Sequence, residues 1–156
     1  MERTKLSKEI VYIGIDPGSS SGGMAYIINR RCFCAQFKDM TEKELCDIFK
    51  SLSNMNSVAM IEKVHVMPGT GAQAATKFMT NYGMLLGFLL ALDIPFKRIT
   101  PQSWMKYYGM KKNSAETKTE WKKRLRQRAQ ELYPKSKIVT NTGDAVLIAE
   151  YCRNNW

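Results

Sequence analysis

Several features that would mark a membrane or secreted protein are missing from this chain of 156 residues. The longest apolar stretch, residues 84–92, is less than half of the roughly 20 residues that a membrane-spanning helix needs. Residues 1–9 are mostly polar and charged, unlike the start of a secretory signal peptide. We therefore expect a cytoplasmic protein that has no membrane partner.

Cysteine is also too sparse to organise the chain. Its four cysteines do not have the spacing of a zinc site: Cys32, Cys34, Cys46 and Cys152. A domain of this size does not need disulfides, so reduced thiols are the expectation. The sequence also has no internal repeat, low-complexity tract or linker, and its length suits one core, so we predict a single domain over residues 1–156.

Acidic residues are few compared with basic ones. The chain has 14 Asp and Glu against 24 Lys and Arg, which gives a formal net charge of +10. A balance this basic favours a polyanionic partner, either nucleic acid or a membrane surface. Because the hydropathy argues against a membrane, nucleic acid is the partner that we expect.

What the sequence does contain begins with a carboxylate in a glycine-rich hairpin. The apolar run 10–15 has the composition of a buried strand and ends at Asp16. Pro17 and Gly18 permit a tight turn, and residues 24–28 read as the returning strand. Such an uncrowded carboxylate suits a metal ion or a phosphate site. The alternative is that Asp16 only caps the turn.

Two further acidic side chains, Glu62 and Asp144, are flanked by apolar residues. Residues 57–61 form a short apolar run that ends at Glu62, and Asn141 and Asp144 stand three residues apart where a helix begins, on one face of it. Acidic groups flanked by apolar residues are costly unless they are paired or share cations. This cost favours a common site for the three carboxylates.

Three motifs in this order resemble the RuvC family of Holliday-junction resolvases, most closely its compact bacteriophage members. They are I-G-I-D-P-G-S at the first strand, I-E-K-V-H-x-M-P-G after the fourth strand, and G-D-A-V-L-I-A-E-Y in the last helix. The resemblance covers nearly the whole chain. It implies an α/β, RNase H-like fold with a central five-stranded mixed sheet, three antiparallel strands first, flanked by helices.

The resemblance also implies a mechanism and a cofactor. Asp16 would bridge two Mg²⁺ ions per subunit, with Mn²⁺ as a substitute, while Glu62 and Asp144 complete the ligand spheres. Asn141 stands where relatives have Asp or His, so it would be a neutral ligand. Lys118 matches a lysine near the scissile phosphate. The expected activity is paired cleavage of four-way DNA junctions by a homodimer, in a bacterial cytoplasm or a phage-infected cell.

A basic segment is the expected DNA-binding surface. Residues 111–137 carry ten Lys and Arg against three Glu, with an apolar seam of helical period that leaves the cations on the outer faces. The alternative is a solvated surface helix. The resemblance to RuvC implies that His65 can stack on an unpaired base, and the alternative is a plain loop histidine. The expected DNA contacts are His65, Lys111, Lys112, Lys118, Lys122, Lys123 and Arg126.

The remaining expectations concern packing and secondary structure. Residues 1–8 read as a polar lead-in, and Gly83 and Gly87 are expected to pack in the core rather than against a second subunit. Trp104, Tyr107 and Tyr108 read as core or surface aromatics. Further strands are expected at 31–37 and 94–99, and helices at 41–53, at 72–92, from Pro101 and near Asp144.

Two rival functions stay open on sequence grounds. The first is a YqgF-type RNase H-like nuclease that acts on RNA, because that type shares the strand followed by D-x-G and a similar length. The second is a junction-binding protein whose active site is weakened at Asn141.

Overall fold

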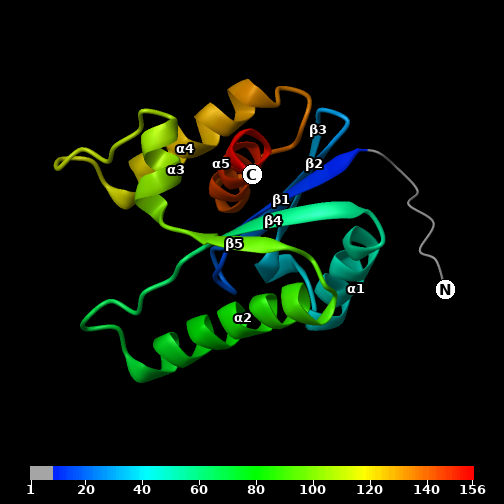
Figure 1. Ribbon diagram of the computed structural model, residues 1–156. Coiled ribbons are helices and arrows are strands. Elements are labelled where there is room, and N and C mark those ends of the chain that lie inside the picture. The colour runs from blue at the N-terminus through cyan, green and yellow to red at the C-terminus, as the bar shows by residue number, and fades with distance from the viewer. Residues whose placement is uncertain (1–8) are drawn as a thin grey trace.

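The computed structural model describes residues 9–156 (Figure 1), so the predicted lead-in at 1–8 lies outside the described residues. The chain begins with an antiparallel meander of β1 (Ile10–Asp16), β2 (Gly23–Ile28) and β3 (Arg31–Gln36). Asn29 and Arg30 turn the chain between β2 and β3 with positive φ angles of 51° and 59°. This pair of positive φ angles is the geometry of a tight hairpin whose twist matches its strands.

Two parallel strands complete the sheet. β4 (Asn56–Glu62) pairs with β1, and β5 (Phe96–Ile99) pairs with β4, so the strand order is β3-β2-β1-β4-β5. The predicted five-stranded mixed sheet is therefore confirmed, although β5 begins two residues later than expected. Ile15 lies opposite Ile61 in the parallel pair, so Asp16 and Glu62 reach the same edge of the sheet.

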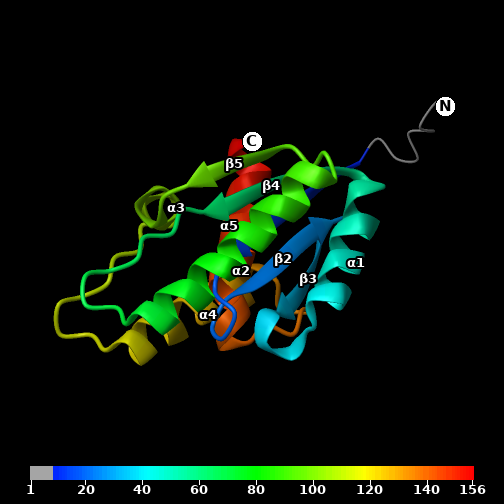
Figure 2. The ribbon, with the colours of Figure 1, turned by 90° about the horizontal axis from the view of Figure 1, so that it is seen from below.

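Helices cover both faces of this sheet. On one face lie α1 (Glu42–Ser53), preceded by the short 3₁₀ helix η1 (Phe37–Asp39), and α2 (Ala72–Ala91), as Figure 2 shows from below. On the other face lie α3 (Pro101–Tyr107), α4 (Lys118–Leu132) and α5 (Thr140–Asn155) (Figure 1). The capping box predicted at Thr41 and Glu44 starts α1.

A close helix-to-sheet contact positions Asp144, the third of the predicted catalytic carboxylates. A Cβ added at Gly14 would lie 2.2 Å from the Ala145 carbonyl oxygen and 2.2 Å from the Ala149 nitrogen. Only glycine lets α5 approach β1 this closely. Because α5 sits directly on β1, Asp144 in its first turns lies beside the end of β1.

The prediction that Gly83 and Gly87 pack in the core is wrong. Both are exposed on the outer side of α2, and a Cβ added at either would meet no atom within 4 Å. Leu90, on the same helix, keeps 63% of its surface exposed. The face of α2 that packs on the sheet instead uses Leu85 and Leu89, which are fully buried.

Candidate active site

The three carboxylates come from three different elements at one edge of the sheet. Asp16 ends β1, Glu62 ends β4, and Asp144 lies in the N-terminal part of α5. Asp16 and Asp144 are buried, with 9% and 4% of their surfaces exposed, and Glu62 is half-buried. The structure thus brings the three predicted catalytic carboxylates into one electrostatic cluster, while their catalytic role stays a prediction.

Burial makes this cluster unfavourable for negative charge. Removal from water raises the pKa of Asp16 well above its usual range, and the charge on Asp144 raises it further. Burial likewise raises the pKa of Glu62 to about 7, and Asp144 adds to this effect. A carboxylate cluster of this kind gains from any cation placed among its oxygens.

One such cation is Lys122, which points inward from α4. Its Nζ donates a hydrogen bond to Asp144 Oδ2 and lies 3.9 Å from Asp16 Oδ2. Burial alone would lower the pKa of Lys122, but the Asp144 and Asp16 carboxylates outweigh it and hold this pKa above its usual value. The prediction of cations only on the outer faces of this helix is therefore wrong for Lys122. The signal was its position beside buried Trp121 and three residues before buried Leu125.

Lys118 lies close enough to the cluster to act on it electrostatically, whereas the described contact of the Asn141 side chain is with β3. Lys118 is the first residue of α4, and its charge lowers the pKa of Asp16. The Asn141 amide nitrogen donates to Gln36 Oε1 at 3.2 Å, at the end of β3. The catalytic role of Lys118 and the metal-ligand role of Asn141 stay predictions.

Trp104 is the site residue that the sequence interpretation missed. It is fully buried in α3, and its indole Nε1 donates to Glu62 Oε2 at 2.7 Å. This hydrogen bond opposes the rise in the pKa of Glu62 and fixes the orientation of the carboxylate. α3 directly follows β5, the neighbour of β4 in the sheet, and this adjacency cannot be read from the sequence locally.

The chemistry of these donors fits a divalent cation. Carboxylate oxygens are the ligands that Mg²⁺ and Mn²⁺ prefer, and Asp144 Oδ1 is buried with no hydrogen-bond partner among the described residues. As the side chains stand, no three His, Cys, Asp or Glu residues within 9–156 are close enough together to hold a metal ion. Lys122 takes the position of a counter-ion between two of the carboxylates.

Replacing Glu62 by Gln should stabilise the metal-free protein at high pH. The folded state holds a proton on Glu62 up to about pH 7, whereas an ordinary Glu loses it near 4.5, so stability falls as pH rises through this window. The wild type thereby loses at most about 3 kcal/mol of unfolding free energy above pH 7, and Glu62→Gln should not show this loss. Thermal melting in EDTA at pH 4 to 8 checks this. A difference in Tm that does not grow with pH would contradict it.

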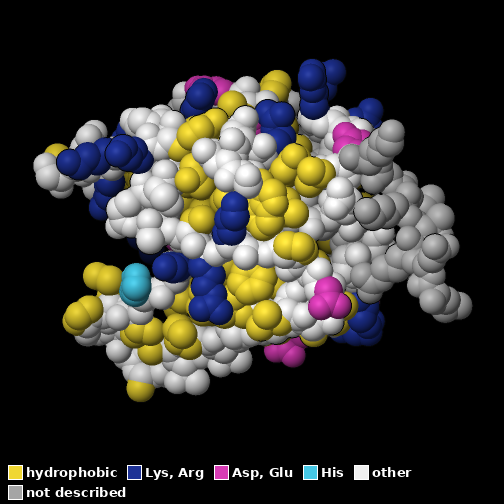
Figure 3. Space-filling model, viewed as in Figure 1, with side chains coloured by type: hydrophobic (Ala, Val, Ile, Leu, Met, Phe, Trp, Pro, Cys, Tyr) yellow, Lys and Arg dark blue, Asp and Glu magenta, His cyan; other side chains and the backbone are white. Residues whose placement is uncertain are grey.

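The predicted DNA-binding residues lie on α4, which carries Lys118, Lys122, Lys123 and Arg126, and on two loops. The loop after Glu62 carries exposed His65, Val66 and Met67, and the loop before α4 carries exposed Lys111 and Lys112. In Figure 3 a projection with lysine and arginine side chains and a projection with the histidine and apolar side chains flank a hollow. The structure therefore places basic and apolar side chains on opposite sides of this opening.

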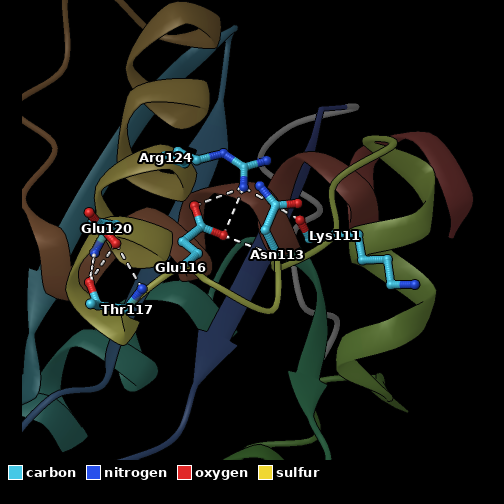
Figure 4. A network of polar contacts seen from close by, with 6 residues as sticks. All are labelled: Lys111, Asn113, Glu116, Thr117, Glu120 and Arg124. Carbon is cyan, nitrogen blue, oxygen red and sulfur yellow. Dashed lines mark hydrogen bonds and ion pairs between the residues drawn. The ribbon is translucent and has the colours of Figure 1, made fainter.

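Figure 4 shows how the loop that carries Lys111 and Lys112, called the basic loop below, is held on α4. Arg124 Nη1 donates to both carboxylate oxygens of Glu116 at 2.9 Å and to the Lys111 carbonyl oxygen at 3.4 Å. Glu116 Oε2 also accepts from the Asn113 backbone N–H at 3.0 Å. A second residue of the basic segment, Arg126, donates through Nε to the Ile138 carbonyl oxygen. These two arginines therefore organise the surface as well as adding charge to it.

Comparison with known proteins gives the fold but no sequence family. No protein-family model matches the chain, and no curated protein matches its sequence. Among solved structures, Thermus thermophilus RuvC in complex with a Holliday junction substrate matches with a TM-score of 0.59 and 13% identity, covering 93% of this chain and 96% of that chain. The chain has a RuvC-like fold.

A second solved structure supports the same assignment. Thermus thermophilus RuvC matches with a TM-score of 0.53 and 14% identity, covering 89% of this chain and 90% of that chain. The RuvC-like fold is an RNase H-like fold, so the predicted fold class is confirmed. Within residues 9–156, no helix is long and apolar enough to cross a membrane.

Proposed function

We propose that this protein is a metal-dependent endonuclease that resolves four-way DNA junctions as a homodimer. The observation that carries the proposal is the convergence of Asp16, Glu62 and Asp144 at one edge of a RuvC-like sheet. Asp16 and Glu62 have pKa values that burial raises, and such a perturbed pair of neighbouring carboxylates is typical of a functional site rather than of a structural one. The neighbour solved with a Holliday junction supports branched DNA as the substrate class.

The chain's own residues would each have a defined part in hydrolysis. Asp16, Glu62, Asp144 and Asn141 would hold two Mg²⁺ or Mn²⁺ ions, which would activate water and stabilise the leaving oxygen. Trp104 holds the Glu62 carboxylate in one orientation, which lowers the cost of ordering it. Lys118, at the start of α4, would attract the substrate phosphate to Asp16; the effect of its charge on the pKa of Asp16 supports this role.

A comparison of substrates tests this proposal. The purified protein is expected to cut a synthetic four-way DNA junction in Mg²⁺ and to leave linear duplex DNA and structured RNA largely intact. Preferential cleavage of the RNA would favour a YqgF-type nuclease instead. Tight junction binding without cleavage in Mg²⁺ or Mn²⁺ would favour a binding protein.

Exchanging three exposed lysines for glutamine should reduce the salt dependence of junction binding. Lys111, Lys112 and Lys123 are exposed on the basic loop and α4. Each lost phosphate contact lowers the magnitude of the slope of log affinity against log salt by about 0.9. The slope of the triple variant should therefore be smaller in magnitude by about 2.7. Fluorescence anisotropy between 50 and 300 mM salt measures this slope. Lys50→Gln, on α1 across the sheet, is the control, and equal slopes for both variants would contradict the assignment.

Glu116→Gln should weaken junction binding without changing its salt slope. The substitution weakens the ion pair with Arg124 that holds the loop, so Lys111 and Lys112 reach the phosphates only after the loop is ordered. We expect a loss of about three- to tenfold in affinity. Glu131→Gln, which removes the exposed pair with Arg128 on the same helix, is the matched control. A parallel loss of slope would mean that Glu116 does more than position the loop.

The outer face of α2 is the surface that we assign to the second subunit. Met79 and Leu90 are exposed on this helix, and the positions around Gly83 and Gly87 are open. Two symmetric cuts across a four-way junction need two active sites, and a two-fold dimer supplies them with one self-complementary surface. Exposed glycines let two such helices approach closely, and the neighbouring apolar side chains gain from burial.

A further inference from the structure

Lys122 lies between two of the carboxylates to which the proposed function assigns the metal ions, and the present inference rests on that function. Its ammonium contacts Asp144 and lies 3.9 Å from Asp16. Its side chain is only 26% exposed, compared with 75% for Lys43, which forms an ordinary surface pair with Asp47. Lys122 is therefore a fixed part of the site in the metal-free chain.

We propose that Lys122 is a resident counter-cation that a divalent metal ion must displace from Asp16 and Asp144. Without a cation, these two buried carboxylates would face each other unpaired, which is strongly destabilising. An ammonium and a divalent cation on the same carboxylate oxygen repel each other, so binding of one excludes the other from that oxygen. The long, flexible lysine stem allows the ammonium to move to the open side of the site while its backbone stays in α4.

This exchange would couple metal binding to substrate binding. The displaced ammonium stays tethered to α4, four residues after Lys118, and becomes available to a phosphate. A bound phosphate stabilises the displaced position, so DNA raises the affinity for metal. By thermodynamic reciprocity, metal raises the affinity for DNA by the same factor. Free protein would then hold its metal weakly, and the site would be fully loaded only on DNA.

Titrating Mn²⁺ into the DNA-free protein at pH 8 tests the exchange without measuring activity. The EPR signal of free Mn²⁺ reports how much of the ion stays unbound. Lys122→Met removes the competing charge and should tighten Mn²⁺ binding at least about fivefold. Lys122→Arg places a guanidinium that holds carboxylates with two parallel hydrogen bonds, and it should weaken Mn²⁺ binding by a similar factor. Lys50→Met removes an equal charge from an exposed position on α1 and should stay within about twofold of the wild type.

Two outcomes separate the inference from the function on which it rests. Equal Mn²⁺ affinities for Lys122→Met and Lys50→Met, or no weakening by Lys122→Arg, would overturn the exchange alone. Absence of Mn²⁺ binding in every variant would overturn the metal-dependent function as well. Thermal melting gives an independent readout: Lys122→Met should lower Tm in EDTA and recover more with Mn²⁺ than the wild type does. If Lys122→Met fails to fold in EDTA, the Lys122→Arg titration still decides the question.

Discussion

Asp16→Asn is expected to abolish junction cleavage while junction binding stays unchanged or becomes tighter. Asp16 is central to the cluster, since Asp144, Glu62, Lys122 and Lys118 all shift its pKa through their charges. An amide keeps the shape of the side chain but removes the charge that would hold the metal ions. Loss of that charge should cost at least about 4 kcal/mol in transition-state stabilisation, or about a thousandfold in rate.

Binding and stability separate this effect from misfolding. Removing one negative charge beside the DNA phosphates does not weaken their attraction to the protein, and removal of a buried carboxylate with a raised pKa should not lower Tm at pH 8. Single-turnover cleavage and anisotropy on the same junction give both quantities. Asp93→Asn, an exposed position, is the control. Loss of binding together with cleavage would indicate a structural role for Asp16.

Gly83→Arg is expected to convert the protein from a dimer to a monomer and to prevent paired cutting. The open space at Gly83 accepts a side chain within the subunit, so the fold should be kept. A charged side chain at the centre of two closely packed helices should raise the dimer dissociation constant at least about a hundredfold, or about 3 kcal/mol. Sedimentation velocity measures the association state.

Gly83→Ala is the matched control for this substitution. Alanine favours a helix over glycine by about 1 kcal/mol and is small enough to keep close helix packing. We expect it to remain dimeric and active, whereas Gly83→Arg should nick junctions on one strand at most. A wild-type protein that is monomeric at micromolar concentration, with Gly83→Arg fully active, would contradict the assignment of this surface.

The sheet and its carboxylates could be predicted because each depends on a local pattern. Apolar runs end at Asp16 and Glu62, and side chains at the ends of adjacent parallel strands necessarily meet. Asp144 follows from the helix that begins near Asn141. These features need only strand and helix periods together with the order of the motifs.

The parts that could not be predicted depend on contacts between distant segments. The hydrogen bond from Trp104 to Glu62 joins positions 42 residues apart, and the contact of Lys122 with Asp144 joins positions 22 apart. Side-chain spacing on one helix does not reveal which partner faces it. The two glycines of α2 illustrate the same limit, since a G-x-x-x-G spacing looks alike on a buried face and an exposed one.

Mapping the products of one synthetic four-way junction in Mg²⁺ tests the central claim most directly. The proposed function predicts two nicks at symmetric positions on opposing strands, with both nicks absent in Asp16→Asn and in EDTA. The pair of nicks follows from two identical active sites related by a two-fold axis. An intact junction with the wild-type protein in both Mg²⁺ and Mn²⁺, or cleavage that persists in Asp16→Asn, would contradict the claim that this carboxylate cluster resolves DNA junctions.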